Sequence, residues 1–185
     1  MSKKILAFGA SNSKNSINKK LASFAAQQIE DAAVNLIDLN DYEMPIYSID
    51  REKESGYPDL AIQFKQQIKE ADGIIISFAE HNGAYTAAYK NIYDWVSRIE
   101  RGVWENKPMF LLSTSPGGRG GKGVLGIALP VYQRGNSNTI ASFSLPSFND
   151  NFKEGEGIVN PELLAAFKEQ LRLFVSAIVT ASNAD

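Results

Sequence analysis

Residues 9–18 read GASNSKNSIN and join a short apolar run to a segment with helical periodicity. The run at residues 5–8 has the length and composition of a buried strand. Behind the turn, apolar side chains recur at helical spacing at Leu21, Phe24, Ala25 and Ile29. This order of strand, turn and helix is typical of the first unit of an α/β fold.

The turn itself has the chemistry of a phosphate site. It contains three serines and three asparagines, whose side chains supply hydrogen-bond donors. The unpaired N–H groups and the positive dipole end at the helix start favour an anion, and Gly9 lets the chain bend away from the strand. Ser16 alone is equally well explained as a helix cap, because capping and anion binding use the same geometry. The turn as a whole therefore predicts a phosphate site, while the role of Ser16 stays open.

The composition excludes several classes of protein. The chain has 185 residues, of which 44% are hydrophobic, so we expect residues 1–185 to form a single domain. The net charge of -2 gives no footprint for nucleic acid or an anionic membrane. Cysteine is absent and no cluster of histidine and carboxylates has metal-ligand spacing, so redox chemistry requires a bound cofactor and no metal is expected. No apolar stretch approaches the roughly 20 residues that span a bilayer, and we expect a soluble, cytoplasmic protein.

Strand-like and helix-like segments alternate along the rest of the chain. Further strands are expected at residues 34–39, 73–78, 108–112 and 139–143, with helices between them and a last helix beginning at Asn160-Pro161. The segment at 40–58 has two prolines and scattered charge, and is expected to be an irregular loop. Five strands separated by helices predict an α/β fold with a doubly wound five-stranded parallel sheet in a three-layer α/β/α sandwich, with ligands bound at the carboxyl ends of the strands.

Three of the loops at those carboxyl ends carry related chemistry. The turn at 9–18 is the first, and the second, at 79–85, contains Asn82-Gly83, where backbone amides can approach a flat polar ligand. The third, at 113–121, is rich in glycine and carries Arg119, which is either solvated or bound to a co-substrate phosphate. The dinucleotide fingerprint and the nucleoside-triphosphate loop are both missing, which disfavours a Rossmann dehydrogenase and an ATPase.

The first loop and the segment at 79–95, AEHNGAYTAAYKNIYDW, together resemble the NADPH-dependent FMN reductase family of flavodoxin-like proteins, and the resemblance covers nearly the whole chain. The family's first loop reads Gly-Ser-x-Arg-x-x-Ser-x-Asn. Its serines fall on Ser11 and Ser16, its asparagine on Asn18 and its arginine on Ser13, so one charged phosphate contact is absent unless Lys14 replaces it.

The second family loop reads Pro-Glu-Tyr-Asn-Gly-Ser. It matches Glu80, Asn82 and Gly83, but places His81 where the family has tyrosine. His81 is either an exposed loop residue or a group that contacts the ring. The helix that follows matches the family at Lys90-Asn91 and Asp94-Trp95, where Lys90 and Asp94 are spaced to pair and Tyr89 and Trp95 are spaced to pack in the core.

The resemblance implies a flavodoxin-like FMN-binding oxidoreductase. NADPH or NADH would supply hydride to FMN, and a flavin, quinone, azo compound or similar acceptor would remove it, so no catalytic side chain is expected. A homodimer or homotetramer is implied as well. The cofactor-binding residues that it implies are Ser11, Ser13, Ser16, Ile17, Asn18, Glu80, His81, Asn82, Gly83, Ser115, Pro116, Gly117 and Gly118.

Two other classes of function stay open. One is an FMN-binding electron carrier, although such carriers are usually strongly acidic and this chain is not. The other is a non-enzymatic module that senses a flavin or a dinucleotide. Oxidation of NAD(P)H in the steady state distinguishes the enzyme from both.

Overall fold

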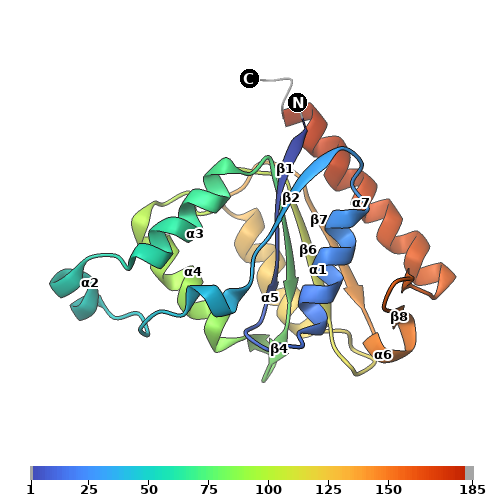
Figure 1. The fold of residues 1–185 in the computed structure, drawn as a ribbon, viewed down its shortest axis with the longest axis horizontal. Helices are drawn as coiled ribbons and strands as arrows, with labels where there is room; N and C mark the ends of the chain where they lie inside the picture. Colours follow the sequence, from blue (N-terminus) through green and yellow to red (C-terminus); the bar gives the residue numbers. More distant parts are fainter. Residues whose placement is uncertain (1, 182–185) are drawn as a thin grey trace.

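The computed structural model describes residues 2–181 and contains a five-stranded parallel sheet between two layers of helices (Figure 1). The strand order is β2-β1-β3-β6-β7. The strands are β1 (Lys3–Ala10), β2 (Ala32–Leu36), β3 (Gly73–Phe78), β6 (Met109–Thr114) and β7 (Ile140–Leu145). The expected doubly wound, flavodoxin-like sheet is confirmed.

Alternate residues of each central strand pack into different layers. In β1, Leu6 and Phe8 belong to the apolar cluster that contains α3 (Asp59–Glu70), α4 (Ala87–Ile99) and α5 (Lys122–Gln133). Ile5 and Ala7 belong to the cluster that contains α1 (Ile17–Gln27) and α7 (Pro161–Ala181). Figure 1 shows α3 and α4 on one side of the sheet and α1 and α7 on the other. Because both faces are covered, the central strands are almost continuously apolar.

The chain reverses its direction of travel across the sheet between β1 and β3. It leaves β1 through α1 toward β2, and then returns past β1 to β3. At the carboxyl edge, Ala10 pairs with Phe78, and Phe78 pairs with Ser113. The segments that follow β1, β3 and β6 therefore begin side by side at the switch point, where folds of this type bind ligands.

The structure explains two features predicted from the sequence, the glycine after β1 and the start of the last helix. A Cβ on Gly9 would lie 2.4 Å from the backbone nitrogen of Lys19, so only glycine lets α1 begin this close to β1. At α7, the side chain of Asn160 accepts hydrogen bonds from the backbone nitrogens of Glu162 (3.0 Å) and Leu163 (3.1 Å). The predicted start of the last helix is confirmed.

Several expected boundaries were wrong. Strand β2 ends at Leu36, and the segment expected to be irregular contains a 3-10 helix η1 (Leu39–Tyr42) and the helix α2 (Ile49–Ser55). Ser48 caps α2 by accepting a hydrogen bond from the backbone nitrogen of Arg51 at 3.2 Å, a signal that was present in the sequence. After β7, the chain forms α6 (Phe148–Asn151) and a short hairpin of β8 (Phe152–Lys153) and β9 (Gly157–Ile158). Across residues 2–181, we find no helix with both the length and the hydropathy needed to cross a membrane.

Candidate functional site

The turn after β1 is held tightly by its own serines. The backbone nitrogen of Ser11 donates to the carbonyl of Gly9 at 2.8 Å, and the hydroxyl of Ser11 accepts from the backbone nitrogen of Ser13 at 3.1 Å. The backbone nitrogen of Ser16 then donates to the carbonyl of Ser13 at 3.1 Å. Ser11 and Ser16 are buried and Ser13 is exposed. The turn is thus a compact loop that ends at the start of α1.

The first turn of α1 has open donors. The hydroxyl oxygen of Ser16 accepts from the backbone nitrogen of Lys19 at 3.1 Å, which confirms the capping role. Within residues 2–181, the backbone N–H groups of Ile17 and Asn18 and the hydroxyl proton of Ser16 have no acceptor, and no acidic residue lies in this helical turn. Capping has therefore not used up the site, and the positive end of the helix remains open to an anion.

Asn18 connects three elements at the carboxyl edge. Its buried side chain accepts hydrogen bonds from the Ser77 hydroxyl (2.8 Å) and the Thr114 backbone nitrogen (3.0 Å), and donates to the Thr114 carbonyl (3.1 Å). These bonds tie α1 to β3 and β6. The side chain thus fixes the geometry of the edge, while its backbone N–H stays available to a ligand. Sequence spacing alone does not separate these two roles.

The segment after β3 is a β-hairpin, which the sequence analysis missed. β4 (Glu80–His81) pairs with β5 (Ala84–Tyr85), and Asn82 and Gly83 form the turn with φ of 52° and 76°. Asn-Gly between paired residues is a strong signal for such a turn, because both positions need positive φ. Tyr85 therefore belongs to β5 and precedes α4, which begins at Ala87. The His81 and Asn82 side chains are exposed on this hairpin.

Thr86 joins the hairpin to β1. Its hydroxyl donates to the carbonyl of Ala10 at 2.9 Å and accepts from the backbone nitrogen of Tyr89 at 3.2 Å. The same side chain caps α4 and holds it against the end of β1. The Thr86 hydroxyl therefore already donates one hydrogen bond and accepts another within the protein. The Ser16 hydroxyl only accepts one within residues 2–181, and its proton is available to a ligand.

Glu80 occupies the start of α5. Its carboxylate accepts from the backbone nitrogen of Val124 at 2.9 Å, and a Cβ on Gly123 would come within 2.7 Å of the same oxygen. A side chain at residue 123 would thus displace the carboxylate. Because Glu80 already supplies negative charge at this helix end, the glycine-rich loop before α5 is a poor place for a second anion. The structure places the Glu80 side chain toward α5.

The loop after β6 is anchored to the chain that follows β7. The carbonyl of Ser115 accepts from the backbone nitrogen of Phe148, and that of Gly117 accepts from Ser147, each at 3.0 Å. Pro116, Gly117 and Gly118 are exposed, and in the part of the chain that the structure describes the N–H groups of both glycines have no acceptor. This loop therefore presents free backbone donors from a fixed position.

The family-like residues on α4 act at a distance from this edge. Asn91 accepts from the backbone nitrogen of Tyr47 at 2.9 Å and donates to the carbonyl of Met44 at 3.1 Å. The indole nitrogen of Trp95 donates to the carbonyl of Pro45 at 2.7 Å. Both residues hold the segment between β2 and α3, residues 37–58, against α4. The sequence pattern did not predict this role.

The predicted side-chain roles on α4 are confirmed. Lys90 and Asp94 form an ion pair at 2.7 Å, and Tyr89 and Trp95 are fully buried.

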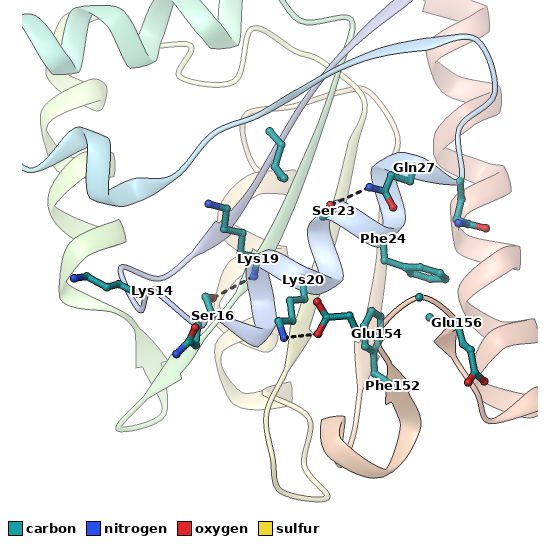
Figure 2. A pocket seen from close by; sticks show the side chains of 15 residues that line it. Lys14, Ser16, Lys19, Lys20, Ser23, Phe24, Gln27, Phe152, Glu154 and Glu156 are labelled. Atoms are coloured by element: carbon teal, nitrogen blue, oxygen red, sulfur yellow. Dashed lines mark hydrogen bonds and ion pairs between the residues drawn. The ribbon is translucent and has the colours of Figure 1, made fainter.

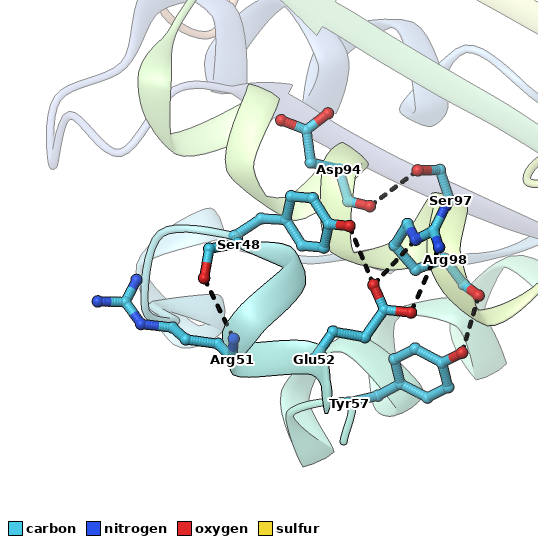
Figure 3. Close-up of polar contacts among 8 residues, drawn as sticks. Ser48, Arg51, Glu52, Tyr57, Asp94, Ser97 and Arg98 are labelled. Atoms are coloured by element: carbon cyan, nitrogen blue, oxygen red, sulfur yellow. Dashed lines mark hydrogen bonds and ion pairs between the residues drawn. The ribbon is translucent and has the colours of Figure 1, made fainter. Parts of the chain in front are cut away.

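A second polar cluster holds α2 on α4. The Tyr47 hydroxyl donates to the Glu52 carboxylate at 2.9 Å, and the Arg98 guanidinium donates to the same carboxylate at 3.0 Å (Figure 3). The Tyr57 hydroxyl donates to the carbonyl of Arg98 at 3.0 Å. The hydrogen bond from Arg98 lowers the pKa of Glu52, so this carboxylate is charged over a wider range of pH than usual.

The structure thus brings the predicted site residues to one edge of the sheet from three segments, the turn at 11–18, the hairpin at 80–83 and the loop at 115–118. Among residues 2–181, no group of three or more histidine, aspartate or glutamate side chains is placed to hold a metal. The site provides backbone N–H and hydroxyl hydrogen-bond donors around the start of α1.

Comparison with known proteins agrees with this geometry. A family model described as NADPH-dependent FMN reductase matches residues 3–151. A 2-hydroxy-1,4-benzoquinone reductase from Burkholderia sp. is 36% identical over 122 residues, which are 65% of this chain and 64% of that protein. An NADPH:quinone oxidoreductase from Arabidopsis thaliana is 38% identical over 79 residues, or 43% and 40% of the two chains. The chain spans less than two thirds of the length of each of these curated relatives.

The fold also has solved counterparts. FerB, a flavoenzyme NAD(P)H:(acceptor) oxidoreductase from Paracoccus denitrificans, has a TM-score of 0.75 and 21% sequence identity, and the match covers 96% of this chain and 98% of that chain. At this identity the likeness establishes the fold alone.

Proposed function

The chain belongs to the NADPH-dependent FMN reductase family, and on that premise we propose that it is an NAD(P)H-dependent oxidoreductase with FMN as its cofactor. Hydride would pass from NADPH or NADH through FMN to a flavin, quinone, azo compound or similar acceptor. The names of its relatives, which include quinone reductases and an NADH-dependent flavin reductase subunit from Lactobacillus johnsonii, support this class of acceptor.

One observation carries the proposal. An open helix start, a β-hairpin and a glycine-rich loop with free amides meet at the β1/β3 switch point. The donors of the first turn of α1 suit a phosphate, because Ser16 keeps a free hydroxyl proton and two N–H groups have no acceptor in residues 2–181. The residues present therefore fit the phosphate end of FMN.

We assign the predicted residues to the phosphate of FMN and to two sides of its flavin ring. Ser11, Ser13, Ser16, Ile17 and Asn18 would hold the phosphate. The hairpin residues would lie along the polar edge of the flavin ring, and the loop after β6 would lie at its pyrimidine side. The hairpin residues are Glu80, His81, Asn82 and Gly83, and the loop residues are Ser115, Pro116, Gly117 and Gly118.

When bound, FMN would supply the hydride chemistry, and the protein would supply orientation and electrostatics. Asn18 holds the three segments at fixed separation, since its side chain bonds to residues on β3 and β6. The carboxylate of Glu80 already supplies negative charge at the start of α5, so the start of α1 is the better site for an anion. No side chain is assigned as a nucleophile, because hydride would pass between the nicotinamide, the flavin and the acceptor without a covalent bond to the protein.

An anaerobic titration tests the proposal. The purified protein is loaded with FMN, separated from free flavin and titrated with NADPH and then NADH while the visible spectrum is recorded. Stoichiometric bleaching by either nucleotide, followed by recovery of colour on adding a quinone, is the expected result. Retained flavin that neither nucleotide bleaches would refute the enzyme and favour an electron carrier or a sensor. Failure to retain flavin would refute the assignment of the three segments.

We also propose a homodimer or homotetramer in the cytoplasm, with residues 1–185 as one domain. Large apolar side chains on the segment between β2 and α3 support self-association, since Ile46 is 76% exposed and Ile49 is 53% exposed. Light scattering at several protein concentrations checks this, and a monomer throughout would contradict it.

A further inference from the structure

A cavity adjoins the first of the three segments proposed to hold FMN and extends away from it along α1. It has a volume of about 570 Å³ and lies along α1, between the turn after β1 and the β8–β9 hairpin (Figure 2). Ser16 lines one end of it, so it is continuous with the proposed phosphate site. A volume of this size suits part of a nucleotide, since ligand pockets measure roughly 300–1,000 Å³.

The charges around this groove are uneven. Lys19 pairs with Asp38, and Lys20 pairs with Glu154 at 3.2 Å across the groove. The other lining carboxylate, Glu156, pairs with Lys153 at 4.0 Å. Lys14, at the end near the turn, has no acidic partner within residues 2–181. Figure 2 shows the Lys20–Glu154 pair beside Phe24 and Phe152. The groove therefore has an uncompensated cation at the end that adjoins the proposed phosphate site.

The opposite end of the groove is aromatic. The rings of Phe24 and Phe152 meet edge to face with centroids 5.6 Å apart, and both side chains are half-buried. Gly157, with φ of +84°, lies against Phe24 so closely that a Cβ would come within 2.1 Å of the ring. The hairpin is thus fitted to this phenylalanine. The hydroxyl of Ser23 and the side-chain amide of Gln27 on α1, and the side-chain amide of Gln28 just after the helix, line the same groove.

Other places at the carboxyl edge are less suitable for a second anionic group. Glu80 already provides a carboxylate at the start of α5. The cavity of about 240 Å³ at the start of α4 is lined by Glu43 and by no lysine or arginine. A nicotinamide dinucleotide carries phosphates beyond the one that FMN would place at α1. Those phosphates need cations, and the groove offers Lys14 and Lys20, whereas the glycine-rich loop at 113–121 offers the single exposed cation Arg119.

We propose that this groove binds the phosphorylated adenosine half of the dinucleotide co-substrate. Lys14 and Lys20 would contact its phosphates, and the adenine would lie against Phe24 and Phe152. The inference rests on the proposed function, because only a dinucleotide reductase needs such a site. The Lys20–Glu154 pair does not block it, since both side chains are exposed to solvent and exposed pairs contribute little net stability. An incoming phosphate would replace Glu154 as the partner of Lys20.

Calorimetric titration with adenosine 2′,5′-bisphosphate tests the groove on the FMN-loaded protein. Lys20→Ala and Lys14→Ala should each weaken binding roughly three- to tenfold, because each removes a charge-assisted contact to phosphate. Glu154→Gln should strengthen binding roughly two- to fivefold by freeing Lys20. The matched control is Lys168→Ala, which removes an exposed lysine of α7 that does not line the groove, and it should leave binding unchanged.

The outcomes separate this inference from the proposed function. Absence of bisphosphate binding, or equal losses in Lys20→Ala and Lys168→Ala, would overturn the groove even if NADPH still bleaches the retained flavin. Competition between FMN and the bisphosphate in flavin-free protein would also overturn it, because both would then share one site. Binding with the expected pattern in a protein that retains no FMN would support the groove and refute the proposed cofactor.

Discussion

Replacing Ile17 by proline should weaken FMN binding while leaving α1 intact. Ile17 is the first residue of α1 after the Ser16 cap, a position where proline is favoured because its missing N–H has no intrahelical partner. Ser16 has φ of -59° and ψ of 115°, so it lies outside the α region that a following proline disfavours. The substitution therefore removes one proposed phosphate donor and little else from the backbone.

The expected loss follows from the charge of the phosphate. A hydrogen bond from an N–H group to a charged acceptor contributes about 2 kcal/mol, which corresponds to a roughly thirtyfold increase in Kd for FMN. The side chain of Ile17 packs partly against the core, so its loss needs a separate control. Ile17→Ala removes most of that packing and keeps the N–H group.

Quenching of flavin fluorescence on titrating the flavin-free protein gives Kd for each variant. Ile17→Pro should bind FMN roughly thirtyfold more weakly than Ile17→Ala, while riboflavin, which lacks the phosphate, should bind both equally. Circular dichroism confirms that both variants keep their helical content. Equal FMN affinity in the two variants, with the fold intact, would show that the start of α1 does not hold the phosphate.

Three further outcomes are expected. Asn18→Leu should lower the free energy of urea unfolding by about 2–4 kcal/mol, because buried partners on β3 and β6 lose their hydrogen bonds. The control is Asn12→Ala at an exposed position of the same turn, and equal small losses in the two variants would show that Asn18 does not tie α1 to β3 and β6. Glu80→Gln should cost about 0.5–1 kcal/mol of stability, less so in high salt, because it keeps a hydrogen-bonding oxygen but removes the charge at the start of α5; an unchanged melting temperature in low salt would argue against that role. The pKa of Glu52 is lowered in the folded protein, so its pair with Arg98 stabilises the fold above the ordinary glutamate value of 4.5 and this stabilisation is lost as the pH falls through the lowered pKa. Arg98→Met should therefore make urea stability fall less steeply with acidification than in the parent, and parallel pH profiles would contradict this.

Periodicity predicted the sheet well because both of its faces are covered. The apolar runs of β1 and β3 and the stripes on α1 and α7 have no competing explanation. The short elements were missed for a different reason. α2 has no buried residue, so no apolar stripe marks it, and only its Ser48 cap and acidic first turn point to a helix. The Asn82-Gly83 turn was interpreted as a place for a ligand, although its dihedral angles serve the hairpin.

The site was predictable as a place, but the division of labour among its residues was not. The sequence pattern of a polar side chain in a loop is the same whether that side chain binds a ligand or another part of the protein. Asn18 is buried with three hydrogen bonds to neighbouring elements, and Glu80 lies against α5. Both match the family pattern, yet both direct their side chains into the protein.

The three helix starts at the carboxyl edge show why α1 is the best phosphate site among them. At α5 the carboxylate of Glu80 is already in place, and at α4 the Thr86 hydroxyl both donates to Ala10 and accepts from the helix. At α1 the Ser16 hydroxyl accepts from the helix but, within residues 2–181, has no acceptor for its own proton. Ser16→Ala should therefore weaken FMN binding more than it weakens the fold, whereas Thr86→Ala should weaken the fold more than it weakens FMN binding. The reverse order, measured by fluorescence titration and urea unfolding of the two variants, would place the phosphate at α4.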